Sequence, residues 1–198
     1  AQPVSREHFP AAGFDTERLQ RMHAMVKQYI DDAKHAGAVT LVARNGKVAD
    51  VATFGYRDLE AKAPMTPDTI FRIYSMSKII TSVAALMLFE EGRFGLDDPV
   101  TDYIPELRTL KVLNTGGEQG DSARLKRPIT VRHLLTHTAG FTYDFSAIEQ
   151  LKTPWVRADV WNEAVDFKDF IRRISFVPLA HHPGDRYTYG VNTDVLGY

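Results

Sequence analysis

The segment Phe71–Lys78, followed by the apolar run from Ile79 to Phe89, constrains this chain more than any other stretch. Apolar residues recur in the run at helical spacing, and most of the remaining positions are apolar as well. A helix that is apolar on nearly all sides is expected inside a domain. The sequence therefore predicts an interior helix that begins near Ser75 and ends before Gly92, because glycine favours the C-terminal stop of a helix.

Ser75 and Lys78 are three residues apart, so they fall on the same side of this helix. A hydroxyl and an amine in this arrangement suit nucleophilic catalysis, with Ser75 attacking and carrying an acyl intermediate. Burial and the positive end of the helix dipole both disfavour a charged amine. We therefore expect a lowered pKa for Lys78, which would let it take the serine proton. Backbone N–H groups at the helix start would stabilise an oxyanion.

The Ser-x-x-Lys tetrapeptide alone is weak support, because about one match is expected by chance in a chain of this length. The alternative is a serine that caps the helix and a lysine that points into solvent. The apolar character of the helix favours the reactive pair. Ser-x-x-Lys occurs nowhere else in the sequence.

Three further segments follow the Phe71–Lys78 segment in order, namely Glu90–Val100, Leu134–Gly140 and Pro183–Gly190. Together the four segments resemble the serine β-lactamase and penicillin-binding-protein superfamily. Within it the sequence is most similar to the class C β-lactamase-like (family VIII) carboxylesterases and related acyltransferases. The resemblance runs from about Gly37 to the last residue.

The resemblance implies an α/β fold in which an antiparallel sheet is flanked by helices and joined to a mainly helical region. Residues 1–72 would begin the sheet region with a helix and a β-hairpin. Residues 73–198 would form the helical region that carries the Ser-x-x-Lys helix and a tyrosine motif.

The resemblance also assigns roles to three residues. Ser75 matches the nucleophile, Lys78 the motif lysine, and Tyr189 the tyrosine that opens the second motif and relays protons. Class C β-lactamases have asparagine two residues after that tyrosine. Val191 stands there in this chain, which favours the esterase branch, with Asn192 as a substitute one place later. The chemistry is reasonable in itself, because an ammonium group favours phenolate and a phenolate is a general base. The alternative for Tyr189 is an ordinary packed aromatic residue.

The resemblance implies a serine hydrolase that acts on carboxylic esters through an acyl-enzyme on Ser75, with acyl transfer to alcohols as a related reaction. One alternative is a β-lactamase or a D-Ala-D-Ala peptidase. An alternative of another class is a catalytically silent relative that binds a ligand or a partner. We predict no cofactor and no metal, and a small-molecule ester as the partner.

Composition restricts the partners and the location. The formal net charge is −1, which argues against nucleic acid or an anionic membrane surface as the main partner. No apolar run reaches the roughly 18 residues of a membrane-spanning helix. Cysteine is absent, so disulfide and thiolate chemistry are excluded for these residues. The start Ala1-Gln2-Pro3-Val4 lacks a basic-then-apolar signal segment and fits equally a mature end left after signal cleavage. Because many members of the family that the chain resembles are exported, a periplasmic or secreted location is slightly favoured over a cytoplasmic one.

Patterns elsewhere predict the flanking elements. An amphipathic helix is expected over Asp15–Ala36, capped by Asp15 or Thr16 and stopped by Gly37. Its predicted buried stripe is Leu19, Met22, Val26, Tyr29, Ile30 and Ala33. Asn45-Gly46 is a strong hairpin signal between strands Ala38–Ala43 and Lys47–Phe54. Loops are expected over Gly55–Thr69 and Asn114–Ala123, and short helices over Val131–Thr136 (capped by Thr130), Asp166–Ile174 and Asn192–Tyr198.

Histidines and aromatic residues complete the candidate sites. His133 and His137 are four apart, as ligands on a helix would be, but no zinc motif surrounds them. We interpret one of them as a hydrogen-bonded structural histidine, and His181 and His182 likewise. Most aromatic residues between Phe141 and Val177 are expected in the core. Tyr143, Phe145 and Trp155 are the predicted walls of an acyl pocket.

The predicted sheet is incomplete, because a single two-stranded hairpin is only marginally stable in water. In the family that the chain resembles, later strands carry a third motif beside the nucleophile, and no such strand is present in this sequence. We therefore expect this chain to be the N-terminal portion of an enzyme whose remaining C-terminal part completes the sheet.

Overall fold

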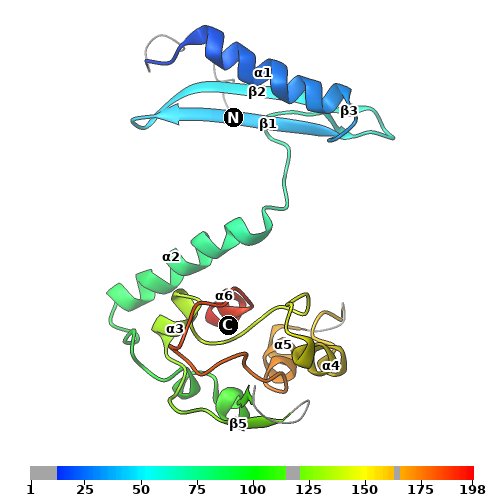
Figure 1. The fold of residues 1–198 in the computed structure, drawn as a ribbon. Helices are drawn as coiled ribbons and strands as arrows, with labels where there is room; N and C mark the ends of the chain where they lie inside the picture. The colour runs from blue at the N-terminus through cyan, green and yellow to red at the C-terminus, as the bar shows by residue number, and fades with distance from the viewer. Residues whose placement is uncertain (1–12, 115–120, 163–165) are drawn as a thin grey trace. The chain divides into compact units, whose positions relative to one another are not determined.

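A computed structural model describes residues 13–114, 121–162 and 166–198. The chain divides into two compact units, one that reaches to Arg72 and one that begins at Ile73 (Figure 1). Within the described ranges, no helix is long and apolar enough to cross a membrane.

The first unit contains a helix and a small sheet. Helix α1 (Thr16–Asp31) is capped by Asp15, whose side chain accepts a hydrogen bond from the backbone N–H of Arg18 at 3.0 Å. The helix lies along strand β2 (Figure 1). Its predicted start and most of its stripe are confirmed, because Leu19 is buried and Met22, Val26 and Ile30 are partly buried. The predicted end is wrong. Ala33 has a φ of 55°, outside the helical region, and Tyr29 and Ala33 are exposed.

The predicted hairpin is confirmed. Strands β1 (Gly37–Arg44) and β2 (Lys47–Asp58) pair antiparallel and are joined by Asn45 and Gly46. Both loop residues have positive φ, 52° and 72°, as a type I′ turn requires.

The loop predicted for Gly55–Thr69 is only partly correct. Strand β2 continues through Gly55, and β3 (Ala63–Pro64) pairs with it to give the sheet order β1-β2-β3. Gly55 permits this continuation, because its φ is 65° and a Cβ there would lie 2.3 Å from the carbonyl oxygen of Ala36.

The second unit begins with the helix that the sequence emphasised. A 3₁₀ turn, η3 (Tyr74–Met76), leads into α2 (Ser77–Glu90), and Gly92 follows with a φ of 70°. The predicted start and stop are confirmed. The predicted burial of the helix is not confirmed. Ala85 is the buried residue of α2 in this structure, whereas Ile79 is 70% exposed. The helix packs along α6 (Asn192–Gly197), so only one side of it is covered by described residues of its own unit (Figure 1).

The remaining elements form the core of the second unit. They are η4 (Val100–Asp102), η5 (Pro105–Thr109), β4 (Lys111–Leu113), β5 (Ser122–Arg124), α3 (Val131–Leu135), α4 (Glu149–Ala158) and α5 (Phe167–Ile174). Helices α3, α5 and α6 confirm the three predicted short helices, with Thr130 and Asp166 as the caps of α3 and α5. The predicted loop Asn114–Ala123 falls mainly on residues 115–120, outside the described residues. Its end is a strand, because Ser122 begins β5.

The prediction that aromatic residues build the core holds for some of them. Phe141, Trp155 and Phe170 are buried with aliphatic side chains from α3, α4, α5 and α6. Phe145, Trp161 and Phe176 are exposed. The periodicity of a short segment does not show which of its aromatic rings faces the core, and the tertiary packing decides it.

Candidate active site

The 3₁₀ turn before α2 places Ser75 and Lys78 next to each other. Tyr74 has a φ of 46°, a left-handed conformation that is uncommon for residues other than glycine. Ser75 follows it, exposed, on the turn, and Lys78 lies in the first turn of α2. The Lys78 Nζ donates to the Ser75 Oγ at 3.3 Å. The spacing of three residues thus gives the contact that helical geometry requires.

Two tyrosines from distant parts of the second unit complete this cluster. The Tyr189 hydroxyl donates to the Ser75 Oγ at 2.6 Å. The Tyr143 hydroxyl accepts from the Lys78 Nζ at 2.9 Å. The two phenol rings are 5.6 Å apart, and the Lys78 Nζ lies 5.0 Å from the centroid of the Tyr189 ring. The structure therefore brings Ser75, Lys78 and Tyr189 together and adds Tyr143 as a direct contact of the amine.

The pKa of Lys78 differs from the value expected from the sequence. Burial lowers the pKa of Lys78, but its hydrogen bond to Tyr143 and its interaction with Tyr189 outweigh burial and raise the pKa above its ordinary value. The lowered pKa expected from an interior helix is therefore wrong. The reason is that the oxygens of Tyr143 and Tyr189 favour the ammonium form more than burial disfavours it.

The two phenols differ from each other. The hydrogen bond with Ser75 lowers the pKa of Tyr189, and the hydrogen bond and charge of Lys78 add to this effect, against the opposing effect of burial. Burial raises the pKa of Tyr143, although Lys78 opposes it. Tyr189 is thus the phenol that ionises more readily, and Tyr143 is the one that keeps its proton.

Asn192, the predicted substitute for the motif asparagine, and Trp155, a predicted pocket wall, both lie inside the unit. Asn192 is 0% exposed, and its Nδ2 lies 3.0 Å from the His137 Nδ1 and 3.3 Å from the Thr188 carbonyl oxygen. Trp155 is 3% exposed, and its Nε1 donates to the Thr142 Oγ1 at 3.1 Å. Neither side chain has a face open to a ligand, because each is packed in the core.

The other two predicted pocket residues lie at the surface of the cluster. Phe145 is 77% exposed and stacks on Tyr143 with 4.9 Å between ring centroids and an interplanar angle of 13°. The Trp161 ring stacks on Tyr143 as well, at 6.2 Å. The stacked rings of Tyr143 and Phe145 thus form an aromatic surface, called the ledge below, next to the hydroxyl that contacts Lys78.

The histidines have separate partners. The His133 Nδ1 accepts from the backbone N–H of Thr130 at 3.1 Å and forms the capping box of α3, a structural contact that lies outside the Leu134–Thr138 segment in which one was expected. His181 bonds to the Thr188 Oγ1 at 2.8 Å, and His182 accepts from the backbone N–H of Lys126 at 3.4 Å. In the described part of the chain, no group of three or more His, Cys, Asp or Glu side chains could hold a metal ion.

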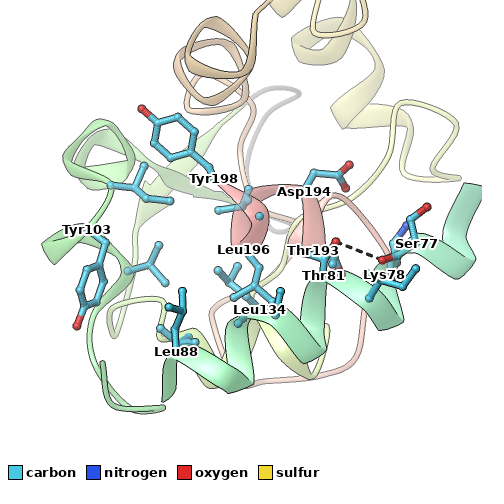
Figure 2. A pocket seen from close by; sticks show the side chains of 18 of the residues that line it. Ser77, Lys78, Thr81, Leu88, Tyr103, Leu134, Thr193, Asp194, Leu196 and Tyr198 are labelled. Atoms are coloured by element: carbon cyan, nitrogen blue, oxygen red, sulfur yellow. Dashed lines mark hydrogen bonds between the residues drawn. The ribbon is translucent and has the colours of Figure 1, made fainter. Parts of the chain in front are cut away.

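A cavity of about 780 Å³ lies beside the cluster, between α2 and α6. Figure 2 shows Ser77, Lys78 and Thr81 of α2 facing Thr193 and Asp194 of α6, with the hydrogen bond from the Thr81 Oγ1 to the Ser77 carbonyl oxygen. Apolar residues such as Leu88, Leu134 and Leu196 line much of the wall. Of Ser75, Lys78, Tyr143 and Tyr189, only Lys78 lines this cavity, which makes it a neighbour of the hydroxyl cluster and distinct from it.

Two contacts of the cluster were not predicted. The Tyr143 hydroxyl meets Lys78 across 65 residues, and the His137 ring packs on the Tyr189 ring at 5.0 Å. The sequence signal for Tyr143 was its place among aromatic residues after the Leu134–Gly140 segment, which suggested a pocket wall and no partner. For His137 the signal was its position in that segment.

Comparisons with known proteins identify the family of this chain. A profile described as Beta-lactamase matches residues 22–198. Protein Rv1367c of Mycobacterium tuberculosis is 38% identical over 90% of this chain and 44% of its own length. Esterase EstB of Burkholderia gladioli is 35% identical over 89% of this chain and 43% of its own length. This chain thus spans a little under half the length of these relatives.

A solved structure with a related fold has also been found. EstCE1, described as a hydrolase with promiscuous acyltransferase activity, superposes with a TM-score of 0.78 and 32% sequence identity, over 90% of this chain and 45% of its own. The predicted β-lactamase-like α/β fold is confirmed. The profile match across most of the sequence and the likeness to these proteins show that the chain belongs to the beta-lactamase family, whose members are serine hydrolases.

Proposed function

We propose that this protein hydrolyses carboxylic esters through an acyl-enzyme formed on Ser75. The observation that carries the proposal is the contact set of one oxygen atom: the Ser75 Oγ lies 2.6 Å from the Tyr189 hydroxyl and 3.3 Å from the Lys78 Nζ. A nucleophile within hydrogen-bond reach of both a base and a cation is the arrangement that activated serine requires.

Tyr189 is the general base of the proposed mechanism. Its phenolate accepts the proton of Ser75 across the 2.6 Å contact while the Ser75 Oγ attacks the ester carbonyl carbon. The tetrahedral oxyanion that results receives a hydrogen bond from the backbone N–H of Ser75. The carbon–oxygen bond to the alcohol then breaks, and Tyr189 returns the proton to the leaving alcohol oxygen. Water, deprotonated by the same phenolate, then attacks the acyl carbon. The bond from that carbon to the Ser75 Oγ breaks, the carboxylic acid leaves, and Tyr189 returns the proton to the Ser75 Oγ.

Lys78 supplies positive charge in this mechanism. Because its pKa is raised, it remains an ammonium ion at neutral pH, and an ammonium ion has no lone pair with which to accept the serine proton. Its charge favours the phenolate of Tyr189 instead. Tyr143, which keeps its own proton, accepts a hydrogen bond from the Lys78 Nζ at 2.9 Å and holds the amine in place.

Three observations favour esters over β-lactams. Val191 occupies the position at which class C β-lactamases carry asparagine, and its side chain is fully buried. One relative is named an esterase, and the structural neighbour EstCE1 is a hydrolase with acyltransferase activity. The ledge of Tyr143 and Phe145 offers ring faces to the acyl or alcohol group of a substrate. Acyl transfer follows if an alcohol replaces water in the second step.

The decisive experiment compares two serines two positions apart. Ser75→Ala should abolish turnover of a p-nitrophenyl ester and covalent labelling by a serine-directed phosphonate, because the attacking oxygen is lost. Ser77→Ala is the matched control and should retain both, since its hydroxyl is not part of the cluster. Unchanged ester turnover in folded Ser75→Ala would refute the proposal.

The same preparations separate the alternatives. Faster turnover of nitrocefin than of a short-chain ester would indicate a β-lactamase or a D-Ala-D-Ala peptidase. A folded protein that the phosphonate does not label at all would indicate a silent member that binds a ligand or partner. Formation of a new ester from an acyl donor and an added alcohol would show acyl transfer.

The two units fit this function as parts of one enzyme. We infer that the unit ending at Arg72 begins the α/β sheet region, and that the unit beginning at Ile73 is the helical region. Relatives about twice as long leave room for a C-terminal part that completes the sheet and supplies a third motif. We expect such an enzyme in the periplasm or outside the cell, which fractionation of the producing cells would test.

A further inference from the structure

We infer that His137 and Asn192 act as a positioning pair that holds Tyr189 against Ser75. The inference rests on the proposed function, in which Tyr189 is the base. It assigns a role to a histidine that the sequence alone suggested was only structural. The relevant contacts join the segment that follows α3, the first residue of α6 and the Tyr189 ring.

The His137 ring packs directly on the general base. Its centroid lies 5.0 Å from that of the Tyr189 ring, at an interplanar angle of 33°. The Tyr187 ring lies 5.8 Å from the His137 ring, between ring centroids. The Tyr143 ring contacts Tyr189 as well, at 5.6 Å. Tyr189 is therefore held between aromatic neighbours, which restricts the direction in which its hydroxyl points.

The residue before Tyr189 is tied down at each of its polar groups. The Thr188 N–H donates to the His137 carbonyl oxygen at 2.8 Å. The Thr188 carbonyl oxygen accepts from the Asn192 Nδ2 at 3.3 Å, and its Oγ1 bonds to the His181 Nε2 at 2.8 Å. These bonds fix the backbone that carries the phenol. The backbone carbonyl of His137 and the side chain of Asn192 supply two of these three hydrogen bonds.

The direction of the hydrogen bonds determines the state of the His137 ring. The Thr188 carbonyl oxygen can only accept, so the Asn192 amide must present its Nδ2 there. The same Nδ2 lies 3.0 Å from the His137 Nδ1, which must then be the acceptor. A neutral ring with its proton on Nε2 satisfies these contacts. Protonation of Nδ1 would set two donors against each other, and buried Asn192 could not turn away without losing Thr188.

The surroundings of the ring favour this neutral state. Burial lowers the pKa of His137, the positive charge of Lys78 lowers it further, and the negative charge of Asp194 opposes both. Tyr187 and Tyr189 are the titratable groups whose rings pack on it. A neutral histidine keeps its acceptor for Asn192 in the pH range in which the base works.

Three variants test the pair. His137→Phe keeps an aromatic ring and removes the acceptor, and Asn192→Ala removes the donor. A base displaced by about 1 Å loses about a hundredfold in rate, so we expect a fall in kcat of that order for both variants, with little change in KM. His137→Asn can place its amide oxygen at the position of Nδ1, and asparagine tolerates the φ of 55° at this residue. This variant should recover most of kcat.

The pH profile of phosphonate labelling distinguishes positioning from simple stability. The rate of labelling of wild type and of His137→Asn should rise over the same pH range. The rate for His137→Phe and Asn192→Ala should rise over a pH range that differs from that of wild type and is the same for both variants. The inference is overturned if folded His137→Phe has the kcat and profile of wild type, or if His137→Asn is as impaired as His137→Phe. If His137→Phe does not fold, an unimpaired Asn192→Ala overturns it equally.

Tyr189→Phe separates this inference from the proposed function. If Tyr189→Phe leaves ester turnover unchanged, the general base has been misassigned, and both proposals fail. If Tyr189→Phe removes turnover while folded His137→Phe and Asn192→Ala do not, only the positioning pair is refuted.

Discussion

The Tyr189 hydroxyl lies 2.6 Å from the Ser75 Oγ, although the two residues are separated by 114 positions in the sequence. Ser75 lies in the 3₁₀ turn η3 near the start of the second unit, and Tyr189 lies just before α6, its last helix among the described residues. A contact this short between the two ends of a unit exists only when the core between them has formed. Catalysis and the folding of that unit should therefore be lost together on denaturation.

Removal of the Tyr189 hydroxyl should affect the chemical step. Tyr189→Phe keeps the ring that packs on His137 and loses the proposed base, so kcat for a p-nitrophenyl ester should fall by about 10²–10⁴-fold with KM nearly unchanged. Tyr103→Phe is the matched control, because its hydroxyl donates to the Asp98 carboxylate instead. A kcat within the range of the control would contradict the assignment of Tyr189.

The pH dependence of activity should depend on Lys78. Tyr189 acts when ionised, so kcat/KM should rise as the pH passes upward through the lowered pKa of Tyr189. It should fall again only when Lys78 loses its proton, above the ordinary lysine pKa. Lys78→Met removes a hydrogen bond and a charge that lower the pKa of Tyr189, so the acid limb should move to higher pH.

Lys78→Arg serves as the control for this shift. A guanidinium group keeps the positive charge, so its acid limb should stay nearer to that of wild type. An acid limb of Lys78→Met that is unchanged, or that moves to lower pH, would show that the amine does not favour the phenolate.

Gly190 should tolerate no side chain. A Cβ there would lie 2.3 Å from the Phe141 carbonyl oxygen and 2.7 Å from the Thr142 Cα, and neither backbone atom can move aside cheaply. Gly190→Ala should reduce the free energy of unfolding by about 1–3 kcal/mol and displace Tyr189, with a loss of kcat. Urea unfolding and ester turnover measure the two effects. Gly197→Ala, where the nearest atom is the Thr81 Cγ2 at 3.3 Å, should cost less.

Phe145 should contribute to substrate binding. Phe145→Ala removes the exposed ring stacked on Tyr143 and should raise KM for an ester with an aromatic acyl group by about fivefold, the equivalent of about 1 kcal/mol of ring stacking. Its kcat should change little. Phe176→Ala, a truncation of another exposed phenylalanine, should leave KM unaltered. Equal KM values for the two variants would exclude the ledge as a binding surface.

The cap of α3 should matter for stability. The Thr130 side chain accepts from the backbone N–H of His133, and the His133 ring accepts from that of Thr130. Thr130→Ala should lower the free energy of unfolding by about 1 kcal/mol. Thr109→Ala removes a bond from an exposed side chain to the Glu106 carbonyl oxygen and should change the free energy of unfolding by less than about 0.5 kcal/mol. Urea denaturation of both variants measures the difference, and equal effects would contradict the capping role.

Local patterns were sufficient for several elements. Asn45-Gly46 determines the first hairpin, because two adjacent residues with positive φ are needed in its turn. Asp15, Thr130 and Asp166 mark helix starts, because a short polar side chain satisfies backbone N–H groups that the helix leaves free. The spacing of Ser75 and Lys78 likewise determines their contact, since helical geometry places residues three apart on one side.

The sequence by itself thus determined the family, the helix starts, the first hairpin and the Ser75–Lys78 pair. Only the tertiary structure decided that Asn192 and Trp155 face the core and that Tyr143 binds the amine. It also decided the charge of Lys78, because the phenol oxygens that hold its proton come from residues 65 and 111 positions further along the chain. Local patterns depend on near neighbours in the chain, whereas burial and pKa depend on groups that folding brings together.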